Sequence, residues 1–261
     1  MSDPTPPKVP PDWWQSLFDE VYLQTDARTV QDGDLTRREV DGLIQALKLE
    51  PHETILDLCG GHGRHALELA RRGYRRVTVL DFSFPLLTLG KAQARESRLP
   101  VAFIRGDAAC APLAGDSFQV VMILANSFGY GAAPEDDVAI LRECHRVLHP
   151  GGRLFLEVAD PDYIRRQLSA QSWHEAGDLV VCRQRWLMEE YLFCRELVLS
   201  RSGGLVRDRG YKVRLYAAAR LGDSLKKAGF TQIEVAGQPD LYAREGDYGA
   251  LNRRLGATAW K

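Results

Sequence analysis

Short apolar runs alternate with amphipathic stretches through the middle of the sequence. The apolar runs have the length and β-prone composition of strands, whereas the stretches between them repeat apolar positions at helical spacing. Predicted strands cover 54–58, 76–80, 101–105, 119–124 and 153–158, and predicted helices cover 63–72, 85–97 and 135–148. Because strands that alternate with helices along a chain form parallel sheets, this region is predicted to be an α/β domain.

The region before this alternation is predicted to contain two helices. Trp14, Phe18 and Tyr22 recur at helical spacing, which predicts a short amphipathic helix near the N-terminus. Thr36 and Glu39 have the spacing of a capping box, in which the two side chains bond to exposed amides at a helix start. A second helix is therefore predicted to begin at Thr36 and to end before Pro51.

After the alternation, the chain contains consecutive strand-like runs. The runs cover 179–188, 190–200 and 205–216. A Gly203-Gly204 pair provides a turn between the last two, so the pattern predicts an antiparallel insertion. The chain then closes with a predicted helix at about 218–228 and predicted strands at 231–236 and about 253–260.

Composition and charge narrow the classes of partner. Hydrophobic residues make up 45% and charged residues 26% of the chain, proportions that are ordinary for folded proteins. The formal net charge is −1, so the chain as a whole has no electrostatic attraction to phosphate backbones or anionic membranes. We therefore expect neither a nucleic acid nor a membrane as a partner.

The cysteines and the N-terminal segment bear on location. The five cysteines are odd in number and form no C-x-x-C pair, so neither a disulfide framework nor a metal site is expected. The Pro-rich N-terminus lacks the basic-then-apolar plan of a secretion signal, and no run approaches the roughly 18 apolar residues of a membrane span. These features favour a cytoplasmic protein with reduced thiols.

The loop after the first predicted strand is rich in glycine. Residues Gly61-His62-Gly63-Arg64-His65-Ala66 satisfy the G-x-G-x-x-[GA] pattern, which lets the backbone approach a ligand between a strand and a helix N-terminus. By itself the pattern also fits a tight strand-to-helix turn that binds nothing. The acidic residues around the loop therefore have to distinguish the two.

Three acidic residues end three successive predicted strands. Asp57 precedes the loop, where a carboxylate suits a cationic amino-acid ligand and repels a pyrophosphate. Asp81 lies about 20 residues after the loop, where a carboxylate accepts both hydroxyls of a ribose. Asp107 ends the third strand and can accept from an exocyclic amine such as that of adenine. Their joint placement favours S-adenosylmethionine (SAM) over a nicotinamide dinucleotide as the ligand.

With these features the sequence resembles the class I SAM-dependent methyltransferases, over roughly residues 50–160 and the closing strands. The resemblance includes Ile55-Leu56-Asp57-Leu58-Cys59-Gly60-Gly61-His62-Gly63, Asp81, Gly106-Asp107-Ala108, Phe118-Gln119-Val120-Val121, Leu141-Arg142-Glu143 and Pro150-Gly151-Gly152-Arg153-Leu154. It implies a Rossmann-like, seven-stranded, mostly parallel sheet with helices on both faces and an antiparallel last strand. It also implies SAM as the cofactor and S-adenosylhomocysteine (SAH) as its product.

The resemblance assigns roles to positions in the loop and at the strand ends. The glycine-rich loop would hold the methionine part of SAM, Asp81 the ribose and Phe82 one face of the adenine. Asp107 and Ala108 would bind the adenine edge. The complete set of expected cofactor-binding residues is Asp57, Cys59, Gly60, Gly61, His62, Gly63, Asp81, Phe82, Ser83, Asp107, Ala108 and Asn126. The family more usually has glycine at the position of Cys59; because cysteine is small, we expect binding to survive, and a catalytic thiol is the less favoured interpretation.

The fourth predicted strand ends in Asn126-Ser127-Phe128-Gly129-Tyr130. It lacks the Asn-Pro-Pro-Tyr of methyltransferases that act on nucleic-acid bases or protein glutamine, which favours another acceptor class. Methyl transfer needs an acceptor lone pair in line with the methyl group, so orientation and exclusion of water do most of the work and a base is optional. The candidate bases are Tyr130, Asp160 and Tyr216, at the ends of elements expected to face the site.

Aromatic residues outside the cofactor core are candidates for acceptor binding, with ordinary core packing as the alternative for each. The expected acceptor-binding residues are Trp14, Phe18, Tyr22, Phe128 and Tyr211. Four arginines in the insertion either bind an anionic acceptor or lie on the solvated face of a strand. They are Arg183, Arg185, Arg195 and Arg214.

We therefore expect an enzyme that transfers the methyl group of SAM to an O, N or C atom of a small molecule, as a monomer or homodimer. The expected organisation is a tail and helical lid over 1–50, a SAM-binding core over 51–178, an antiparallel β insertion for acceptor binding over 179–216, and a closing helix and strands over 217–261. The alternatives are a methyltransferase that acts on a protein or RNA, a nicotinamide-dependent oxidoreductase and a non-catalytic SAM-binding protein.

Overall fold

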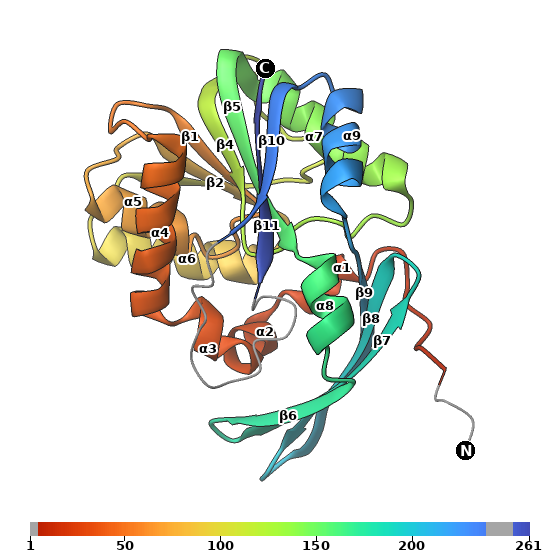
Figure 1. Ribbon diagram of the computed structural model, residues 1–261. Coiled ribbons are helices and arrows are strands. Elements are labelled where there is room, and N and C mark those ends of the chain that lie inside the picture. Colours follow the sequence, from red (N-terminus) through yellow and green to blue (C-terminus); the bar gives the residue numbers. More distant parts are fainter. Residues whose placement is uncertain (1–4, 239–252) are drawn as a thin grey trace.

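Two β-sheets organise the structure, a computed structural model that describes residues 5–238 and 253–261 (Figure 1). The first sheet has seven strands in the order β10-β11-β5-β4-β1-β2-β3. Its strands are β1 (Ile55–Leu58), β2 (Val77–Asp81), β3 (Val101–Arg105), β4 (Phe118–Ile123), β5 (Leu148–Ala159), β10 (Thr231–Gly237) and β11 (Arg254–Trp260). Strands β1 to β5 pair in parallel, whereas β11 pairs antiparallel to both β5 and β10. The parallel sheet predicted from the alternation of strands and helices is confirmed, as is the Rossmann-like, seven-stranded arrangement that the family resemblance implies.

Helices cover both faces of this sheet because successive side chains of the buried strands point to opposite faces. In β1, Ile55 packs in an apolar cluster with α4, α5 and α6, whereas Leu56 packs in another cluster with α7 and α9. The bounds of these helices are α4 (Gly33–Leu47), α5 (Arg64–Arg71), α6 (Phe84–Glu96), α7 (Pro134–Val147) and α9 (Ala218–Lys227). Within the described part of the chain, no helix has both the length and the apolar character needed to cross a membrane.

The N-terminal region differs from the prediction of one amphipathic helix. It contains three short helices, α1 (Trp14–Leu17), α2 (Glu20–Thr25) and α3 (Ala27–Val30). The break follows from Asp19, whose carboxylate accepts from the amides of Val21 at 2.9 Å and Tyr22 at 3.1 Å and so starts α2 as a separate helix. The regular spacing of the aromatic residues therefore did not predict a continuous helix correctly.

The helix α4 begins three residues earlier than the predicted capping box. Asp32 caps it by accepting from the amide of Leu35 at 2.9 Å, and the hydroxyl of Thr36 donates to the carbonyl of Asp32 at 2.9 Å. Glu39 does not return to the helix start, because it forms buried ion pairs with Arg64 and Arg254. The predicted capping box is thus wrong, and its glutamate joins distant segments instead.

The second sheet is antiparallel, with the order β6-β7-β8-β9, as predicted for the insertion. Its strands are β6 (Gln171–Ala176), β7 (Leu179–Met188), β8 (Tyr191–Ser200) and β9 (Gly204–Arg214). Strand β6 and the preceding helix α8 (Pro161–Gln167) were not predicted. Figure 1 shows this sheet at one end of the molecule, beside α8.

Candidate active site

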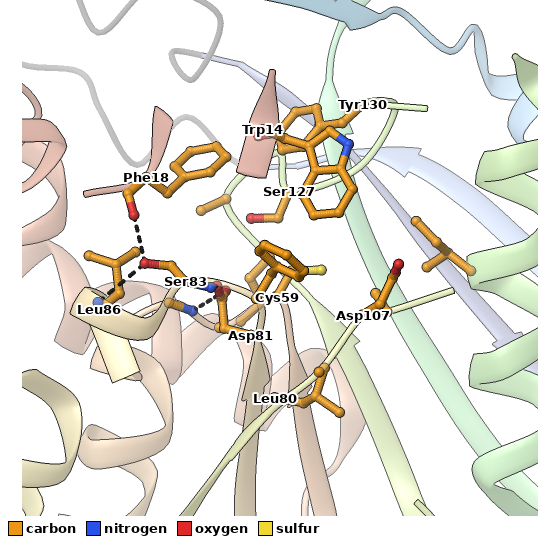
Figure 2. A pocket seen from close by; sticks show the side chains of 18 of the residues that line it. Trp14, Phe18, Cys59, Leu80, Asp81, Ser83, Leu86, Asp107, Ser127 and Tyr130 are labelled. Atoms are coloured by element: carbon orange, nitrogen blue, oxygen red, sulfur yellow. Dashed lines mark hydrogen bonds between the residues drawn. The ribbon is translucent and has the colours of Figure 1, made fainter. Parts of the chain in front are cut away.

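A cavity of about 430 Å³ lies at the carboxyl ends of β1, β2, β3 and β4. Open α/β sheets bind ligands at this edge, and small-molecule sites commonly enclose about 300–1,000 Å³. The predicted site residues that line the cavity are Trp14, Phe18, Tyr22, Asp57, Cys59, Gly60, Gly61, His62, Asp81, Phe82, Ser83, Asp107, Ala108 and Tyr130. Figure 2 shows Trp14 and Tyr130 on one side of the space, with Cys59 and Asp81 opposite.

The glycine-rich loop leaves no room for larger side chains. A Cβ atom on Gly60 would lie 2.7 Å from the carboxyl carbon of Asp57, and one on Gly63 would lie 2.9 Å from the ring of Phe103. Cys59 has φ of 59°, a left-handed conformation that glycine adopts without strain. This explains why glycine is the usual residue at that position. Burial raises the pKa of the Cys59 thiol well above its ordinary value, so the thiol stays protonated at neutral pH.

The carboxyl group of Asp57 is buried in the cavity wall, where the backbone amide of Ala66 is near enough to favour its ionised form. The residue is only 1% exposed, and within the described residues neither carboxylate oxygen has a hydrogen-bond partner. Burial raises the pKa of Asp57 to about 7, with Asp81 adding to the effect and Arg64 opposing it. Buried polar groups in native proteins are almost always bonded, so an unpaired carboxylate in a cavity wall indicates a position for a cationic or hydrogen-donating ligand. The amino group and sulfonium of SAM fit this requirement.

Asp81 joins the glycine-rich loop to the start of α6. One carboxylate oxygen accepts from the amide of Gly61 at 2.7 Å, and the other accepts from the amide of Ser83 at 2.8 Å. Burial raises the pKa of Asp81 above its ordinary value, and these two bonds oppose the rise. Each oxygen keeps a further lone pair for a ligand hydroxyl, which fits the predicted role in binding a ribose.

Asp107 and Phe82 line the part of the cavity beyond β2 and β3. Asp107 is exposed at the rim, and its carboxylate accepts from the amide of Ala109 at 2.8 Å. The ring of Phe82 lies edge-on to Trp14 with 5.0 Å between centroids, and the guanidinium of Arg105 lies 5.5 Å from its centre. These positions are compatible with an adenine between a ring face and a carboxylate.

The N-terminal helices place aromatic side chains over this cofactor region. Phe18 stacks with Tyr130 at 5.8 Å and meets the ring of Tyr22 edge-on at 5.1 Å. The carbonyl of Phe18 accepts from the hydroxyl of Ser83 at 2.6 Å, so the lid is bonded to the residue that caps α6. Trp13 lies behind this layer, 6% exposed, with its ring 4.8 Å from that of Tyr130. The lid is therefore part of the cavity wall.

Two tyrosines and a histidine of the cavity are uncharged at neutral pH. Burial raises the pKa of both Tyr22 and Tyr130 above that of an ordinary tyrosine, and it lowers the pKa of His62 to about 4. The hydroxyl of Tyr130 donates to the carbonyl of Asn126 at 2.8 Å, whereas that of Tyr22 has no hydrogen-bond partner among the described residues. Neither tyrosine is ionised enough to act as a strong base, and Tyr22 has the free donor.

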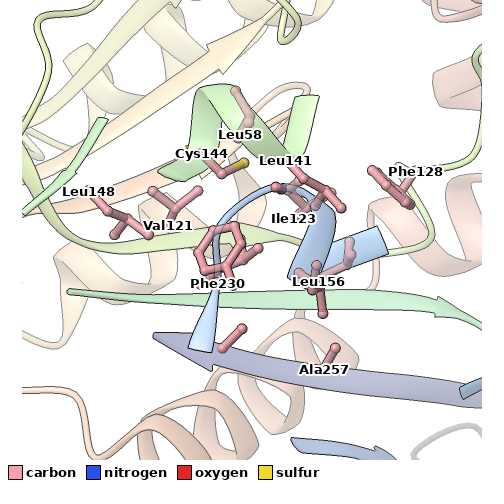
Figure 3. Packing of buried hydrophobic residues seen from close by; sticks show 14 of the residues in the cluster. Leu58, Val121, Ile123, Phe128, Leu141, Cys144, Leu148, Leu156, Phe230 and Ala257 are labelled. Carbon is pink, nitrogen blue, oxygen red and sulfur yellow. The ribbon is translucent and has the colours of Figure 1, made fainter. Parts of the chain in front are cut away.

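Six predicted site residues lie outside the cavity lining, each in a structural contact. They are Gly63, Asn126, Phe128, Asp160, Tyr211 and Tyr216. Asp160 caps α8 by accepting from the amide of Asp162 at 2.9 Å, and buried Tyr216 donates to Asp137 at 2.7 Å. Figure 3 shows Phe128 at one end of the apolar cluster between the sheet and α7, where its ring lies 5.4 Å from that of Tyr216.

The other three predicted site residues outside the cavity lining are Gly63, Asn126 and Tyr211, and each has a structural role. Gly63 precedes α5 with φ of 74°. The side-chain oxygen of Asn126 accepts from the amide of Ala159 at 2.8 Å, which joins the ends of β4 and β5. Tyr211 packs its ring 5.6 Å from that of Trp13. These structural roles explain the three residues, and none of them requires a bound ligand.

The four arginines of the insertion also lie away from the described cavity lining. Arg183 pairs with Asp26 and Glu196, Arg195 pairs with Asp208, and Arg214 pairs with Asp137. Arg185 donates to the carbonyl of Ser169 at 3.2 Å. Their partners account for these guanidinium groups, so the geometry does not support an anion-binding role.

Several cavity residues were not predicted from the sequence. They include Pro11, Asp12, Val30, Arg64, His65, Leu124, Ser127, Gly131, Ala132 and Asp136. Arg64 lies inside the glycine-rich motif and Ser127 directly follows the fourth strand, so both positions carried a signal in the sequence. Val30 belongs to α3, which had no periodic pattern to reveal it.

Comparison with known proteins gives the same picture of the central region. Residues 55–152 match a family model described as a methyltransferase domain. The ubiquinone/menaquinone biosynthesis C-methyltransferase UbiE of Ruegeria sp. (strain TM1040) is 32% identical over 146 residues. That match covers 54% of this chain, and the chain spans 57% of the length of this curated relative.

Solved structures extend the likeness to nearly the whole chain at the level of the fold. A SAM-dependent methyltransferase from Clostridium acetobutylicum ATCC 824 superposes with a TM-score of 0.71 at 14% identity, over 92% of this chain and 96% of that one. CalS10, an amino pentose methyltransferase from Micromonospora echinaspora solved with SAM bound, gives a TM-score of 0.65 at 20% identity, over 93% and 98% of the two chains.

Proposed function

We propose that this chain is a class I SAM-dependent methyltransferase that transfers the methyl group of SAM to an O, N or C atom of a small molecule, as its match to a methyltransferase-domain model and its fold support. The observation that supports this most strongly is the placement of Asp57 and Asp81 in one ligand-sized cavity under an aromatic lid. When bound, SAM supplies an electrophilic methyl group on a sulfonium and leaves as SAH.

We propose that the cofactor-binding residues stabilise the positive charge of SAM and fix its orientation. The unpaired carboxylate of Asp57 stabilises positive charge on the ligand, and the free lone pairs of Asp81 accept from the ribose hydroxyls. Phe82 and Asp107 hold the adenine. Since these groups are fixed by the loop and by strand ends, the ligand is oriented without rearrangement of the sheet.

The proposed work of the lid is to exclude water and to bind the acceptor. Trp14, Phe18, Tyr22 and Tyr130 present aromatic rings to the cavity, which suits an acceptor that contains a ring. The free hydroxyl of Tyr22 orients the acceptor by donating a hydrogen bond, while the protonated tyrosines leave the proton of the acceptor to solvent or to a later step. The name of UbiE refers to the biosynthesis of quinones, and that of CalS10 to an amino pentose. Quinones and amino pentoses are both small molecules.

Ligand-induced stabilisation tests the proposal first. A ligand present at 100 times its dissociation constant raises the unfolding free energy by about 2.7 kcal/mol, which gives a measurable rise in melting temperature. We expect SAM and SAH to raise it and NADH to leave it unchanged. The opposite result would exclude the proposed cofactor. Incubation of a metabolite extract with methyl-labelled SAM, followed by mass spectrometry, then identifies the acceptor.

We also propose that the protein acts in the cytoplasm, as a monomer or homodimer, without a nucleic-acid partner. The net charge of −1 supports the absence of a nucleic-acid partner, and the five free cysteines support a reducing compartment. Size-exclusion chromatography with light scattering measures the oligomeric state directly.

A further inference from the structure

The short helix α2 is bonded at both ends to the second sheet. At its N-terminus, the carboxylate of Asp19 caps the helix and also forms an ion pair with Arg207 of β9. At its C-terminus, the carboxylate of Asp26 accepts from the hydroxyl of Thr25 at 2.9 Å and from the guanidinium of Arg183 of β7 at 2.7 Å. Each end of α2 therefore has a carboxylate held by an arginine of the other sheet.

One buried residue joins these two arginines. Glu196 of β8 is 3% exposed; one carboxylate oxygen accepts from Nε of Arg183 at 2.9 Å, and the other accepts from Arg207 at 3.3 Å. Acidic and basic side chains thus alternate without a gap in the order Asp19, Arg207, Glu196, Arg183 and Asp26. Hydrogen bonds between charged groups are strong and directional, and water cannot readily replace them where the groups are buried.

Further contacts bring α1 and α2 against the same face of the sheet. His174 of β6 lies 2.8 Å from the carbonyl of Thr25, and Arg209 of β9 donates to the carbonyl of Ser16 at 2.7 Å. Val21 packs against a buried apolar cluster of the sheet, made of Leu179, Val181 and Val198. The neighbouring Tyr22 lines the cavity. The position of α2 against the second sheet therefore fixes where Tyr22 lies in the cavity wall.

Among the residues that the structure describes, β6 to β9 contribute none to the cavity lining. The insertion was expected to bind the acceptor directly, yet its side chains reach the cavity wall only by contacting residues of other elements. The ionic series ends at α2, and Arg214 of β9 donates to the carbonyls of Gly131 and Ala132, which line the cavity. We propose that Glu196 is a positioning residue that, through Arg183 and Arg207, fixes both ends of α2 and so places Tyr22 in the acceptor part of the cavity. The consequence for acceptor binding rests on the proposed function, whereas the consequence for α2 does not.

Hydrogen exchange of α2 tests the inference without any need for activity. Glu196→Gln keeps the shape of the side chain and removes the charge between the two arginines. The matched control is Arg195→Gln, which alters an exposed ion pair with Asp208 on the opposite face of the same strand. We expect amides of residues 19–26 to exchange at least tenfold faster in Glu196→Gln, with residues 55–71 unchanged, and no change in the control. Unchanged exchange in 19–26, or an equal rise in 55–71, would overturn the inference.

A milder variant covers the case in which Glu196→Gln does not fold. Asp19 is at the partly exposed end of the charge series, and asparagine caps helices as well as aspartate does. Asp19→Asn therefore removes the ion pair with Arg207 while keeping the cap. Faster exchange in 19–26 supports the inference, and exchange equal to that of the unmodified protein contradicts it.

Kinetic measurements separate the inference from the proposed function. With an acceptor in hand, Glu196→Gln should raise the KM for the acceptor at least fivefold while the affinity for SAM stays within twofold. Its effect should be smaller than fivefold in a Tyr22→Phe background, because the two changes act through one contact. Additive effects would contradict the inference. If the protein binds no SAM, the proposed function fails, and hydrogen exchange still decides the role of Glu196.

Discussion

The carboxylate of Asp81 accepts a hydrogen bond of 2.7 Å from the amide of Gly61, across twenty residues of sequence. This bond joins the end of β2 to the loop that follows β1, and the second carboxylate oxygen bonds to the amide of Ser83 at 2.8 Å. Asp81, the predicted ribose acceptor, therefore also holds the backbone of the glycine-rich loop. A substitution at Asp81 should affect both ribose binding and the conformation of this loop.

Replacement of Asp81 should weaken SAM binding more than it weakens the fold. Asp81→Asn offers one acceptor oxygen in place of two, so either the ribose hydroxyls or the loop amide loses its partner. Hydrogen bonds to charged groups contribute about 1.5–3 kcal/mol, which predicts an affinity about 10- to 100-fold lower by calorimetry. Asp116→Asn, at an exposed aspartate on the other side of the sheet, is the control. Equal affinities for the two variants would remove Asp81 from the site.

The titration of Asp57 predicts a rise in SAM affinity with pH. The pKa of its buried carboxyl is about 7 in the folded protein, and a cationic ligand binds the ionised form. Affinity should rise by at most about tenfold per pH unit up to pH 7 and level off above it. Asp57→Asn should remove this dependence. A pH profile that is the same in both proteins would show that another group is responsible.

Asp57 should also give the ligand-free protein the opposite pH trend. Its folded pKa is above the ordinary value of 3.8, so the folded state binds more protons than the unfolded state between about pH 4 and pH 7. The stability contributed by protonated Asp57 is fully present below pH 4 and is lost as the pH rises through 7. Urea unfolding at several pH values should show a smaller loss over this range in Asp57→Asn.

Enlarging Gly60 should disrupt the loop through Asp57. The added methyl group of Gly60→Ala would lie 2.7 Å from the Asp57 carboxylate, so the loop or the carboxylate has to move. We expect SAM affinity to fall at least tenfold. Gly42→Ala is the matched control, because a Cβ atom at Gly42 in α4 meets nothing within 4 Å. The control should bind SAM normally and gain up to about 1 kcal/mol of stability from helix propensity.

The thiol of Cys59 should be dispensable. Cys59→Gly relieves a left-handed backbone conformation that costs about 1–2 kcal/mol, and the greater freedom of glycine in the unfolded chain offsets about 0.5–1 kcal/mol of that gain. Stability should therefore rise by no more than about 1.5 kcal/mol, with turnover retained. Cys59→Val, which puts a β-branched residue at positive φ, should lower the melting temperature clearly. Loss of turnover in a folded, SAM-binding Cys59→Gly protein would instead indicate a catalytic thiol.

Tyr216 should contribute to stability rather than to catalysis. Its hydroxyl donates to the buried carboxylate of Asp137 at 2.7 Å, and the residue is 1% exposed. Tyr216→Phe leaves a buried acceptor with one donor fewer, which should lower the unfolding free energy by about 1–3 kcal/mol in urea titrations. Turnover per folded molecule should stay the same. A large fall in kcat at unchanged stability would restore Tyr216 as a candidate base.

The sheet and the convergence of three acidic residues at one of its edges were predictable because both depend on the order of elements along the chain. Parallel strands bring their carboxyl ends to one edge, so Asp57, Asp81 and Asp107 converge once the alternation is recognised. The lid was harder to predict, because the capping bonds of Asp19 divided a periodic pattern into two helices. Glu39 was misassigned since its partner Arg254 lies 215 residues away. Contacts between such distant charges leave no local spacing in the sequence.

The order β10-β11-β5 has a consequence for how the protein is made. The ribosome makes β10 before β11, yet among the described strands β10 pairs with β11 alone. While the ribosome translates the residues between them, the hydrogen-bonding edge of β5 stays open, and such an edge can pair with strands of other nascent chains. A ribosome that stalls before Arg254 would therefore prolong the exposure of this edge on the nascent chain. Slow codons in that stretch should lower the yield of native protein relative to fast synonymous codons at the same positions.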